Sequence, residues 1–196
     1  MNRTQLASDV TSRGGTVEIR AASAADREAI KSFVMGLSPR ARFLRFFSPV
    51  APPSSGVLRR MCGAGLGTDA LVATENGVII GHAMAAEVAG PDGCRVADIG
   101  LVVTDRWQSR GVGSQMLSDV IALAAARGVG GLVMEVLPEN RGMLAMISRR
   151  WTDARYEFGG GSVTVRVSLQ ARDRGVGGDG GNGKEQHCRG AALRAA

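Results

Sequence analysis

Lysine is scarce in this chain: only Lys31 and Lys184 occur among 196 residues, so arginine carries nearly all of the basic charge behind a net charge of +6. A basic surface favours acidic partners, but a bias toward Arg, Ala and Gly also follows from genome composition. Aromatic residues make up only 4%, and no basic run carries the interleaved aromatic side chains that bind single-stranded nucleic acid. We therefore expect no nucleic acid partner.

Cysteine and long apolar runs are scarce as well. Cys62, Cys94 and Cys188 form an odd set without C-x-x-C spacing, which favours a reducing compartment. The N-terminus lacks an apolar signal segment, and no apolar run approaches the ~18 residues that a membrane span requires. Three cysteines and two histidines at irregular spacing form no metal-ligand pattern. We expect a soluble cytoplasmic protein without a metal and without a membrane partner.

A hydrophobic fraction of 44% predicts a globular chain with one ordinary domain. Residues 1–15 are polar and aperiodic, and we interpret them as a flexible leader. The domain is expected over residues 16–172. Residues 173–196 are rich in glycine and charge and lack aromatics, so they are expected to form a disordered tail or linker. If they form a linker, this domain is one part of a longer protein with a further domain.

Hydrophobic periodicity predicts that a strand and helices come first, antiparallel strands follow, and helices then alternate with strands. The dipeptide Asn76-Gly77 stands between two apolar runs, which is the signal of a type I′ hairpin. Helices are expected at 23–38, 39–47, 114–128 and 138–150, with a further apolar segment at 57–62. Strands are expected at 16–23, on both sides of the turn within 70–88, at 94–103, at 131–137 and as a pair within 155–169.

The segment "DRWQSRGVGSQM" lies between a predicted strand and a predicted helix. A glycine loop before a helix places unpaired N–H groups and the positive end of a helix dipole together, which is an anion site. A P-loop is excluded because G-x-x-x-x-G-K-[ST] does not occur. A dinucleotide fingerprint is disfavoured because Met116 stands where its third glycine should be, and because eight residues separate Val103 from Gly111.

The hexapeptide from Gln108 to Gly113, "QSRGVG", resembles the [RQ]-x-x-G-x-[GA] motif of the GNAT superfamily of acyl-CoA-dependent N-acetyltransferases. The order of predicted elements across residues 16–169 is similar to that family's order too. This resemblance implies an α+β fold, an α/β/α sandwich whose mixed, mostly antiparallel central sheet carries helices on both faces. It also implies acetyl-CoA as co-substrate and no metal.

By the same resemblance, individual residues take roles in holding acetyl-CoA. The backbone of Val102 and Val103 would pair with the pantetheine arm, and Asn140 would hydrogen-bond the same arm. From its place after Pro138, Asn140 could equally begin a helix. The pyrophosphate would be held by the motif that begins at Gln108, through the amides of Arg110, Gly111, Val112, Gly113 and Ser114.

The transfer itself needs a base, because a free lysine has a pKa of ~10.4 and its amine must be neutral to attack a thioester. Asp98, in "VADIGLVV", is our candidate, at a position where similar lysine acetyltransferases generally carry glutamate. Its side chain is one methylene shorter, so a bridging water would restore the reach. Alternatively, Asp98 is an outward-facing strand residue. Glu135 is the second candidate base, ahead of Glu87 and Asp105.

A general acid is not evident in the sequence. Many family members place a tyrosine in the helix after the asparagine, but that position falls near Ile147 here. The chain's one tyrosine, Tyr156, lies beyond the predicted helix. A CoA thiol can leave as thiolate if nearby N–H dipoles stabilise it, so the assignment stands without an acid.

The segment "LSPRARFLRFFSP" resembles that of the bacterial Pat-type protein lysine acetyltransferases, as do "GHA" and "EVLPENRGML". This resemblance implies a protein substrate with an exposed lysine, such as an AMP-forming acyl-CoA synthetase, notably acetyl-CoA synthetase. Arg40, Arg42 and Arg45 are expected to meet an acidic surface on it. The alternatives are a small-molecule amine N-acetyltransferase and a non-catalytic acyl-CoA sensor.

Overall fold

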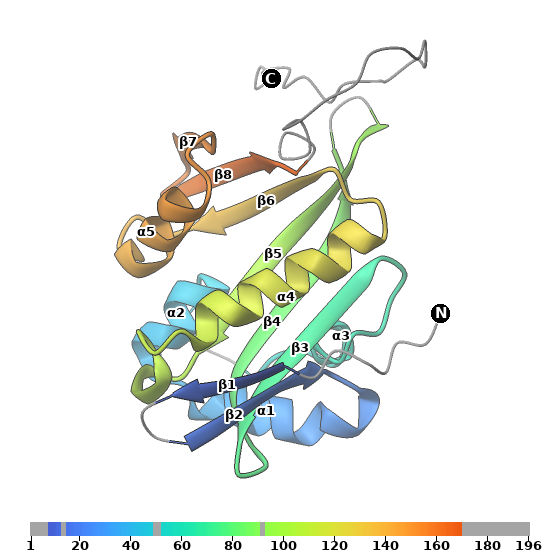
Figure 1. Ribbon diagram of the computed structural model, residues 1–196, viewed down its shortest axis with the longest axis vertical. Helices are drawn as coiled ribbons and strands as arrows, with labels where there is room; N and C mark the ends of the chain where they lie inside the picture. Colours follow the sequence, from blue (N-terminus) through green and yellow to red (C-terminus); the bar gives the residue numbers. More distant parts are fainter. Residues whose placement is uncertain (1–7, 13–14, 49–51, 91–92, 170–196) are drawn as a thin grey trace.

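The computed structural model describes residues 8–12, 15–48, 52–90 and 93–169, which form one eight-stranded sheet with helices on both faces (Figure 1). The strand order is β1-β2-β3-β4-β5-β6-β8-β7, and only the β5–β6 pair is parallel. The predicted α+β class with a mixed, mostly antiparallel sheet is therefore confirmed. The strands are β1 (Ser8–Ser12), β2 (Gly15–Ala21), β3 (Thr68–Glu75), β4 (Val78–Ala89), β5 (Arg95–Val103), β6 (Gly131–Val136), β7 (Arg155–Gly159) and β8 (Ser162–Ser168).

The helices lie close to their predicted positions. No helix in the described ranges is long and apolar enough to cross a membrane. The predicted tail at 173–196 lies outside the described residues, so that part of the domain prediction stays a prediction. The helices are α1 (Arg27–Gly36), α2 (Pro39–Phe46), α3 (Ser55–Met61), α4 (Val112–Ala126) and α5 (Arg141–Arg150), with short 3-10 turns at Ala24–Asp26 and Asp105–Trp107.

The N-terminal strand β1 differs from the expectation of a flexible leader over residues 1–15. Residues 8–12 pair antiparallel with β2, from Ser8 opposite Ile19 to Ser12 opposite Gly15. Residues 1–7 lie outside the described part of the chain. This edge strand is held to β2 by a ladder of backbone hydrogen bonds. Such bonds do not depend on the side chains, so they produce no hydrophobic periodicity in the sequence. The sequence therefore could not reveal this strand.

The hairpin between β3 and β4 is confirmed. Asn76 and Gly77 have φ values of 49° and 77°, the positive pair that a type I′ turn requires. Glu75 pairs with Val78 across the turn, and β4 then pairs with β5 along its length, from Gly81 opposite Val103 to Ala89 opposite Arg95. The predicted turn before β5 includes residues 91 and 92, which lie outside the described residues.

Successive residues of the central strands point into two different cores. Leu71 belongs to the core under α4 and α5, whereas its neighbour Val72 belongs to the core under α1, α2 and α3. α4 comes close to the sheet because β4 has a glycine there: a Cβ on Gly81 would lie 2.9 Å from Met116 Sδ. The position of α4 on the sheet therefore depends on a residue without a side chain.

The parallel pair β5–β6 holds together over only part of its length. The paired residues run from Val96 opposite Gly131 to Asp98 opposite Val133, although β5 continues to Val103 and β6 to Val136. Beyond Asp98 the two strands diverge toward the end of the sheet at which α2 lies (Figure 1). One edge of β5 is thereby left open beside the N-terminus of α4.

Candidate functional site

The glycine loop ends in the N-terminus of α4, as the sequence predicts. Gly111 is the N-cap, with a left-handed φ of 87° that a side chain would strain. The first helical hydrogen bond runs from the Gln115 amide to the Gly111 carbonyl at 3.0 Å. The amides of Val112, Gly113 and Ser114 precede that bond and have no acceptor within the helix. This end of α4 is therefore suited to bind an anion.

Side-chain contacts of Trp107 and Gln108 hold the loop before α4 in place. Trp107 is buried in the core under α4, and the Arg110 guanidinium lies 5.1 Å from the centroid of its ring. The Gln108 side-chain amide donates to the Val103 carbonyl at 2.9 Å and to Asp105 Oδ1 at 3.1 Å. Gln108 thus shapes the loop with the same side chain that the motif assigns to the cofactor site.

A cavity of about 450 Å³ lies at the N-terminus of α4, between β5, α2 and α5. We call it the α4 cavity. Arg110 does not line it, and Val112 is fully buried below it. The predicted cofactor residues that do line it are Val102, Val103, Gln108, Gly111, Gly113, Ser114 and Asn140.

The sequence did not identify the wall that α5 contributes to the α4 cavity. Arg149, in the last turn of α5, lines the cavity, as do Met143 and Met146. The Ser114 hydroxyl lies 3.3 Å from Met146 Sδ, which fixes the start of α4 against α5. The packing of α5 against α4, seen in the contact of two residues 32 apart in sequence, brings Arg149 to the site, and no local pattern could have found it.

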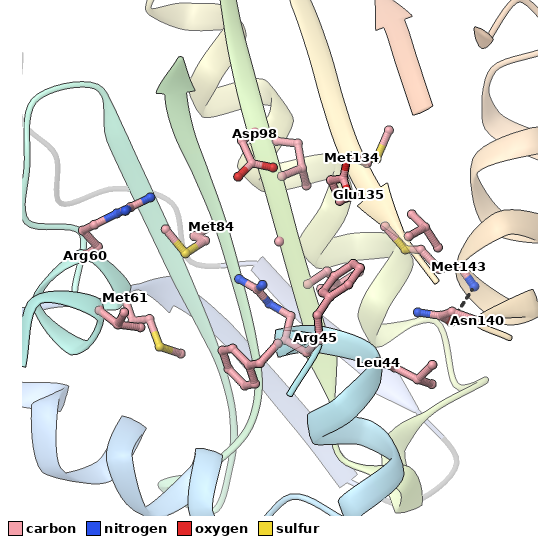
Figure 2. A pocket seen from close by; sticks show the side chains of 17 residues that line it. Leu44, Arg45, Arg60, Met61, Met84, Asp98, Met134, Glu135, Asn140 and Met143 are labelled. Carbon is pink, nitrogen blue, oxygen red and sulfur yellow. Dashed lines mark hydrogen bonds between the residues drawn. The ribbon is translucent and has the colours of Figure 1, made fainter. Parts of the chain in front are cut away.

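Asn140 begins a helix, which is one of the two roles that its position allowed, and its contact with the pantetheine arm stays a prediction. It is the N-cap of α5, and its side-chain oxygen accepts from the Met143 amide at 3.2 Å (Figure 2). Its side chain also borders the α4 cavity. Because the oxygen is used by the helix, the NH₂ group is the part that can donate to a ligand.

A second cavity, of about 320 Å³, is lined in part by β5 and shares lining residues with the first (Figure 2). We call it the acceptor cavity. Asp98 and Glu135 line it from neighbouring strands, and Arg45 and Arg60 line it from α2 and α3. Figure 2 shows these four charged side chains around a common space. The residues that line both cavities are Leu44, Arg45, Leu101, Asn140 and Met143.

Asp98 lies where the pairing of β5 with β6 ends. Its side chain reaches solvent, yet the atoms around it displace enough water that burial raises its pKa. Arg45 and Arg60 oppose this shift, and the negative charge of Glu135 adds to it. A carboxylate with a raised pKa is a stronger base. The structure therefore combines both readings of Asp98, a strand residue that faces outward and a group that faces a cavity.

Glu135 has a different environment on the next strand. Its two oxygens accept hydrogen bonds of 2.8 Å from the hydroxyls of Ser162 and Thr164 on β8. These bonds fix the orientation of the carboxylate. Glu87 instead forms an ion pair with Arg95 at 2.7 Å, and neither Glu87 nor Asp105 lines the acceptor cavity.

The structure offers no tyrosine to either cavity. Ile147, near the position where similar enzymes carry the acid, is fully buried in the core. Tyr156 lies on β7 and packs its ring against the same core. Since Tyr156 is the chain's only tyrosine and lines neither cavity, a phenol cannot protonate a leaving group here without rearrangement.

The three arginines expected at the acceptor surface do not share a surface. Arg40 is exposed beside Gln108 and Glu139. Arg42 donates to the carbonyls of Met35 and Leu37 at 2.6 and 3.1 Å, so it ties α2 to the end of α1. The third, Arg45, points inward. We therefore leave Arg42 out of any acceptor surface.

Three comparisons with known proteins bear on this site. The sequence model of the acetyltransferase (GNAT) family matches residues 43–150. The structure is similar to the GNAT domain of S. lividans PAT, with 28% identity and a TM-score of 0.73, over 83% of this chain and 97% of that one. No curated protein matches the sequence.

Two further solved structures share the fold at lower identity. One is a cAMP-binding acyltransferase from Mycobacterium smegmatis, at 23% identity and a TM-score of 0.56, where the match covers 84% of this chain and 47% of that one. The other is yncA from Salmonella typhimurium, solved with its cofactor acetyl-CoA, at 21% identity and a TM-score of 0.59. That match covers 83% of this chain and 98% of the other.

Proposed function

This chain belongs to the acetyltransferase (GNAT) family, and we propose that it transfers an acetyl group from acetyl-CoA to the side-chain amine of a lysine on another protein. The observation that carries the proposal is the junction of two cavities. One cavity begins at the N-terminus of α4 and the other contains the carboxylates Asp98 and Glu135. Donor and acceptor can thus approach each other from opposite sides of one point on β5.

The α4 cavity fits the charge of acetyl-CoA. Its pyrophosphate would accept from the amides of Val112, Gly113 and Ser114, with Arg149 adding positive charge from α5. The pantetheine arm would lie along β5 where β6 has diverged and left backbone groups without a neighbouring strand. Val102 and Val103 are the residues whose backbone meets it there.

The acceptor side favours a protein over a small molecule. Helices α1, α2 and α3 pack against the part of the sheet up to β5. On β6, β8 and β7 the side chains facing the same way are polar and reach solvent, namely Glu135, Ser162, Thr164, Arg166 and Glu157. An exposed lysine of a folded protein could therefore approach the acceptor cavity over this surface. The likeness to the GNAT domain of S. lividans PAT supports the same choice.

Asp98 is the group that we assign as base. It takes a proton from the lysine ammonium, directly or through one water. The neutral nitrogen can then bond to the thioester carbonyl carbon. The carbon–sulfur bond then breaks, and CoA leaves with the electron pair as thiolate. Glu135 holds the incoming amine by charge, in the orientation that Ser162 and Thr164 impose on it. We propose that the acceptors are exposed lysines of AMP-forming acetyl-CoA synthetase.

A small amine is the second candidate acceptor. The close pair of Asp98 and Glu135 would suit a cationic amine, and the cavity of about 320 Å³ could enclose one. Arg45 and Arg60 line the same cavity and would repel a polyamine. We therefore rank the small amine below the protein lysine, and a non-catalytic acyl-CoA sensor below both.

Thiol release from acetyl-CoA in the presence of purified AMP-forming acetyl-CoA synthetase tests the proposal. Wild type should release thiol and acetylate lysine, Asp98→Asn should lose most of the activity, and Glu135→Gln should lose less. Glu18→Gln, an exposed carboxylate on β2, is the matched control and should behave as wild type. Activity on small amines alone would replace the protein acceptor with the second candidate. Acetyl-CoA binding without turnover on either acceptor would favour a non-catalytic acyl-CoA sensor.

A further inference from the structure

The thioester must lie where the two cavities meet, because the donor enters from one and the amine from the other. The walls common to both cavities come from Leu44, Arg45, Leu101, Asn140 and Met143. Only Arg45 and Asn140 among them have polar side chains, and the Asn140 oxygen is already used by the Met143 amide. Among the described residues common to both cavities, Arg45 therefore carries the only charge.

The backbone of β5 makes room for the Arg45 side chain. A Cβ at position 100 would collide with the guanidinium, with Arg45 Nη1 only 2.9 Å away and Cζ and Nη2 closer still. The φ of Gly100 is not in the left-handed region, so glycine is needed there for space and not for conformation. The guanidinium thus lies against β5 at Gly100, on the strand along which the donor would bind.

The guanidinium has no anionic partner within the described ranges of the chain. No carboxylate oxygen there lies within 4.0 Å of it, and its Nε atom is buried without a hydrogen-bond partner. Asp98 is the carboxylate whose charge it feels, without direct contact. Its other close contact is the Phe46 ring, whose centroid lies 5.1 Å from Cζ. A buried cation without a partner is costly unless a ligand supplies negative charge.

We propose that Arg45 is a catalytic residue that donates hydrogen bonds to the carbonyl oxygen of the thioester and stabilises the negative charge that develops on it. This inference rests on the acetyl-CoA half of the proposed function, not on the identity of the acceptor. Arginine remains protonated even where burial lowers its pKa, so its charge is available at any working pH. Such donors contribute most in a site that excludes water.

Arg45 assists the attack of the amine on the thioester. The neutral amine nitrogen bonds to the carbonyl carbon, and the π electrons of the C=O bond move onto the oxygen, where the guanidinium faces them. The proton of the new ammonium passes to solvent water, because Asp98 already holds the proton that it took from the lysine ammonium. The oxygen then reforms the double bond, the carbon–sulfur bond breaks, and the thiolate leaves with that pair. The stabilised alkoxide compensates for the tyrosine acid that neither cavity contains.

Two other roles for Arg45 make different predictions. If it binds a carboxylate of the acceptor, Arg45→Gln should raise the KM for the acceptor and leave kcat near wild type. If it only packs on Gly100 and Phe46, the variant should lower thermal stability and change kcat little. The proposed role predicts a fall in kcat of about 10² to 10³-fold, as for loss of one oxyanion donor, with the Kd for acetyl-CoA and the acceptor KM unchanged. Arg59→Gln, on the exposed side of α3, is the control.

A second variant displaces the guanidinium without removing its charge. Gly100→Ala places a methyl group where the guanidinium lies, so it should lower kcat in the same manner as Arg45→Gln. The two losses should not add when combined, because the second change removes nothing further. Gly36→Ala, at the end of α1 with open space around it, is the glycine control. Losses that multiply would contradict a shared mechanism.

Infrared spectroscopy of bound acetyl-CoA with a ¹³C carbonyl tests the contact without any acceptor. Wild type should lower the carbonyl stretching frequency relative to free acetyl-CoA, and Arg45→Gln and Gly100→Ala should return it toward the free value. Bound acetyl-CoA with the same frequency in wild type and both variants overturns the inference and leaves the proposed function intact. No binding of acetyl-CoA to wild type overturns both.

Discussion

Asp98 and Glu135 line the same cavity, but their carboxylates have different surroundings. Burial raises the pKa of Asp98, so it holds a proton more readily. Glu135 accepts two hydroxyl hydrogen bonds, which fix the orientation of its carboxylate. A carboxylate with a raised pKa suits proton transfer, and one held by two hydrogen bonds suits the positioning of a charged amine. This contrast is the basis for assigning proton transfer to Asp98.

The pH dependence of the rate should follow from that assignment. As pH falls, wild type should lose kcat/KM at a higher pH than an ordinary aspartate near 3.9 would cause, because the pKa of Asp98 is raised. Asp98→Asn should lower the rate by about 10² to 10⁴-fold. Its residual rate should keep rising with pH toward the lysine pKa of ~10.4, because only amines that are already neutral react. Steady-state kinetics from pH 5 to 10 would measure both profiles, and profiles of the same shape would reject Asp98 as base.

His82 on β4 should make the stability of the fold sensitive to acid. It is fully buried, its Nε2 donates to the Met61 carbonyl at 2.9 Å, and burial lowers its pKa to about 4. The unfolded chain, with a histidine pKa near 6.5, binds a proton first as pH falls. The stability that neutral His82 contributes is therefore present above about pH 6.5 and is lost as pH falls toward about 4, by about 3 kcal/mol in all.

Urea denaturation at pH 7 and pH 5 would measure that loss for His82. His82→Gln keeps a donor for the Met61 carbonyl and cannot titrate, so its stability should differ less between the two pH values. Asp26, whose pKa is lowered to about 2 by its bond to Arg20, loses its contribution only below about pH 4 and does not confuse the comparison. Equal pH dependence in wild type and variant would show that another group is responsible.

Residues of the site were predictable where their signal is local. The loop glycines and Asp98 belong to one strand–loop–helix segment, in which Gly111 and Gly113 line the α4 cavity and Asp98 lines the acceptor cavity. Their roles in binding and catalysis stay predictions. Arg149 was not predicted, because it lies on α5, far along the chain from the glycine loop. Arg45 was expected on the outer surface, since a period of 3.6 along α2 cannot show that Gly100 lies beneath it.

At the scale of elements, the contact between α4 and β4 determines where the anion-binding amides lie. A Cβ on Gly81 would lie 2.9 Å from Met116 Sδ and 3.3 Å from the Ala73 side chain. A change in this contact moves the N-terminus of α4 relative to β5.

Gly81→Ala should therefore affect both stability and acetyl-CoA binding. Overpacking of a core by a methyl group typically costs 1–3 kcal/mol, so we expect a loss of about that size, together with weaker binding of acetyl-CoA. Urea denaturation and isothermal titration calorimetry measure the two effects. Adding Met116→Ala should restore part of the stability, because it removes the atom that the new methyl group meets. Gly36→Ala, with no neighbour within 4 Å, should change neither property. An unchanged Gly81→Ala variant would contradict the contact.

The elements that the sequence predicted best are those with specific chemistry. Asn76-Gly77 adopts the two positive φ values that few residues tolerate, so the turn and both flanking strands were predictable. β1 was missed because it is held by its backbone ladder with β2. The predicted helix at 138–150 begins at Arg141 instead, because Asn140 caps it and the residues before form a turn.

At the scale of the whole molecule, the divergence of β5 and β6 creates the site. Pairing stops at Asp98 opposite Val133, and the gap beyond leads from the α4 cavity to the acceptor cavity. Each strand alone is regular, so the sequence of neither strand shows where they separate. The resemblance to the GNAT family implied such a site, and the register of the sheet gives its location.

The most direct test of the central claim is mass spectrometry of peptides from AMP-forming acetyl-CoA synthetase after incubation with this protein and acetyl-CoA. Our account predicts acetylation of a specific lysine with wild type and its near absence with Asp98→Asn, while both proteins bind acetyl-CoA equally. Acetylation at the same sites and rates without the protein, or with the Asp98 variant, would contradict the claim that Asp98 and the two joined cavities catalyse acetyl transfer to a protein lysine.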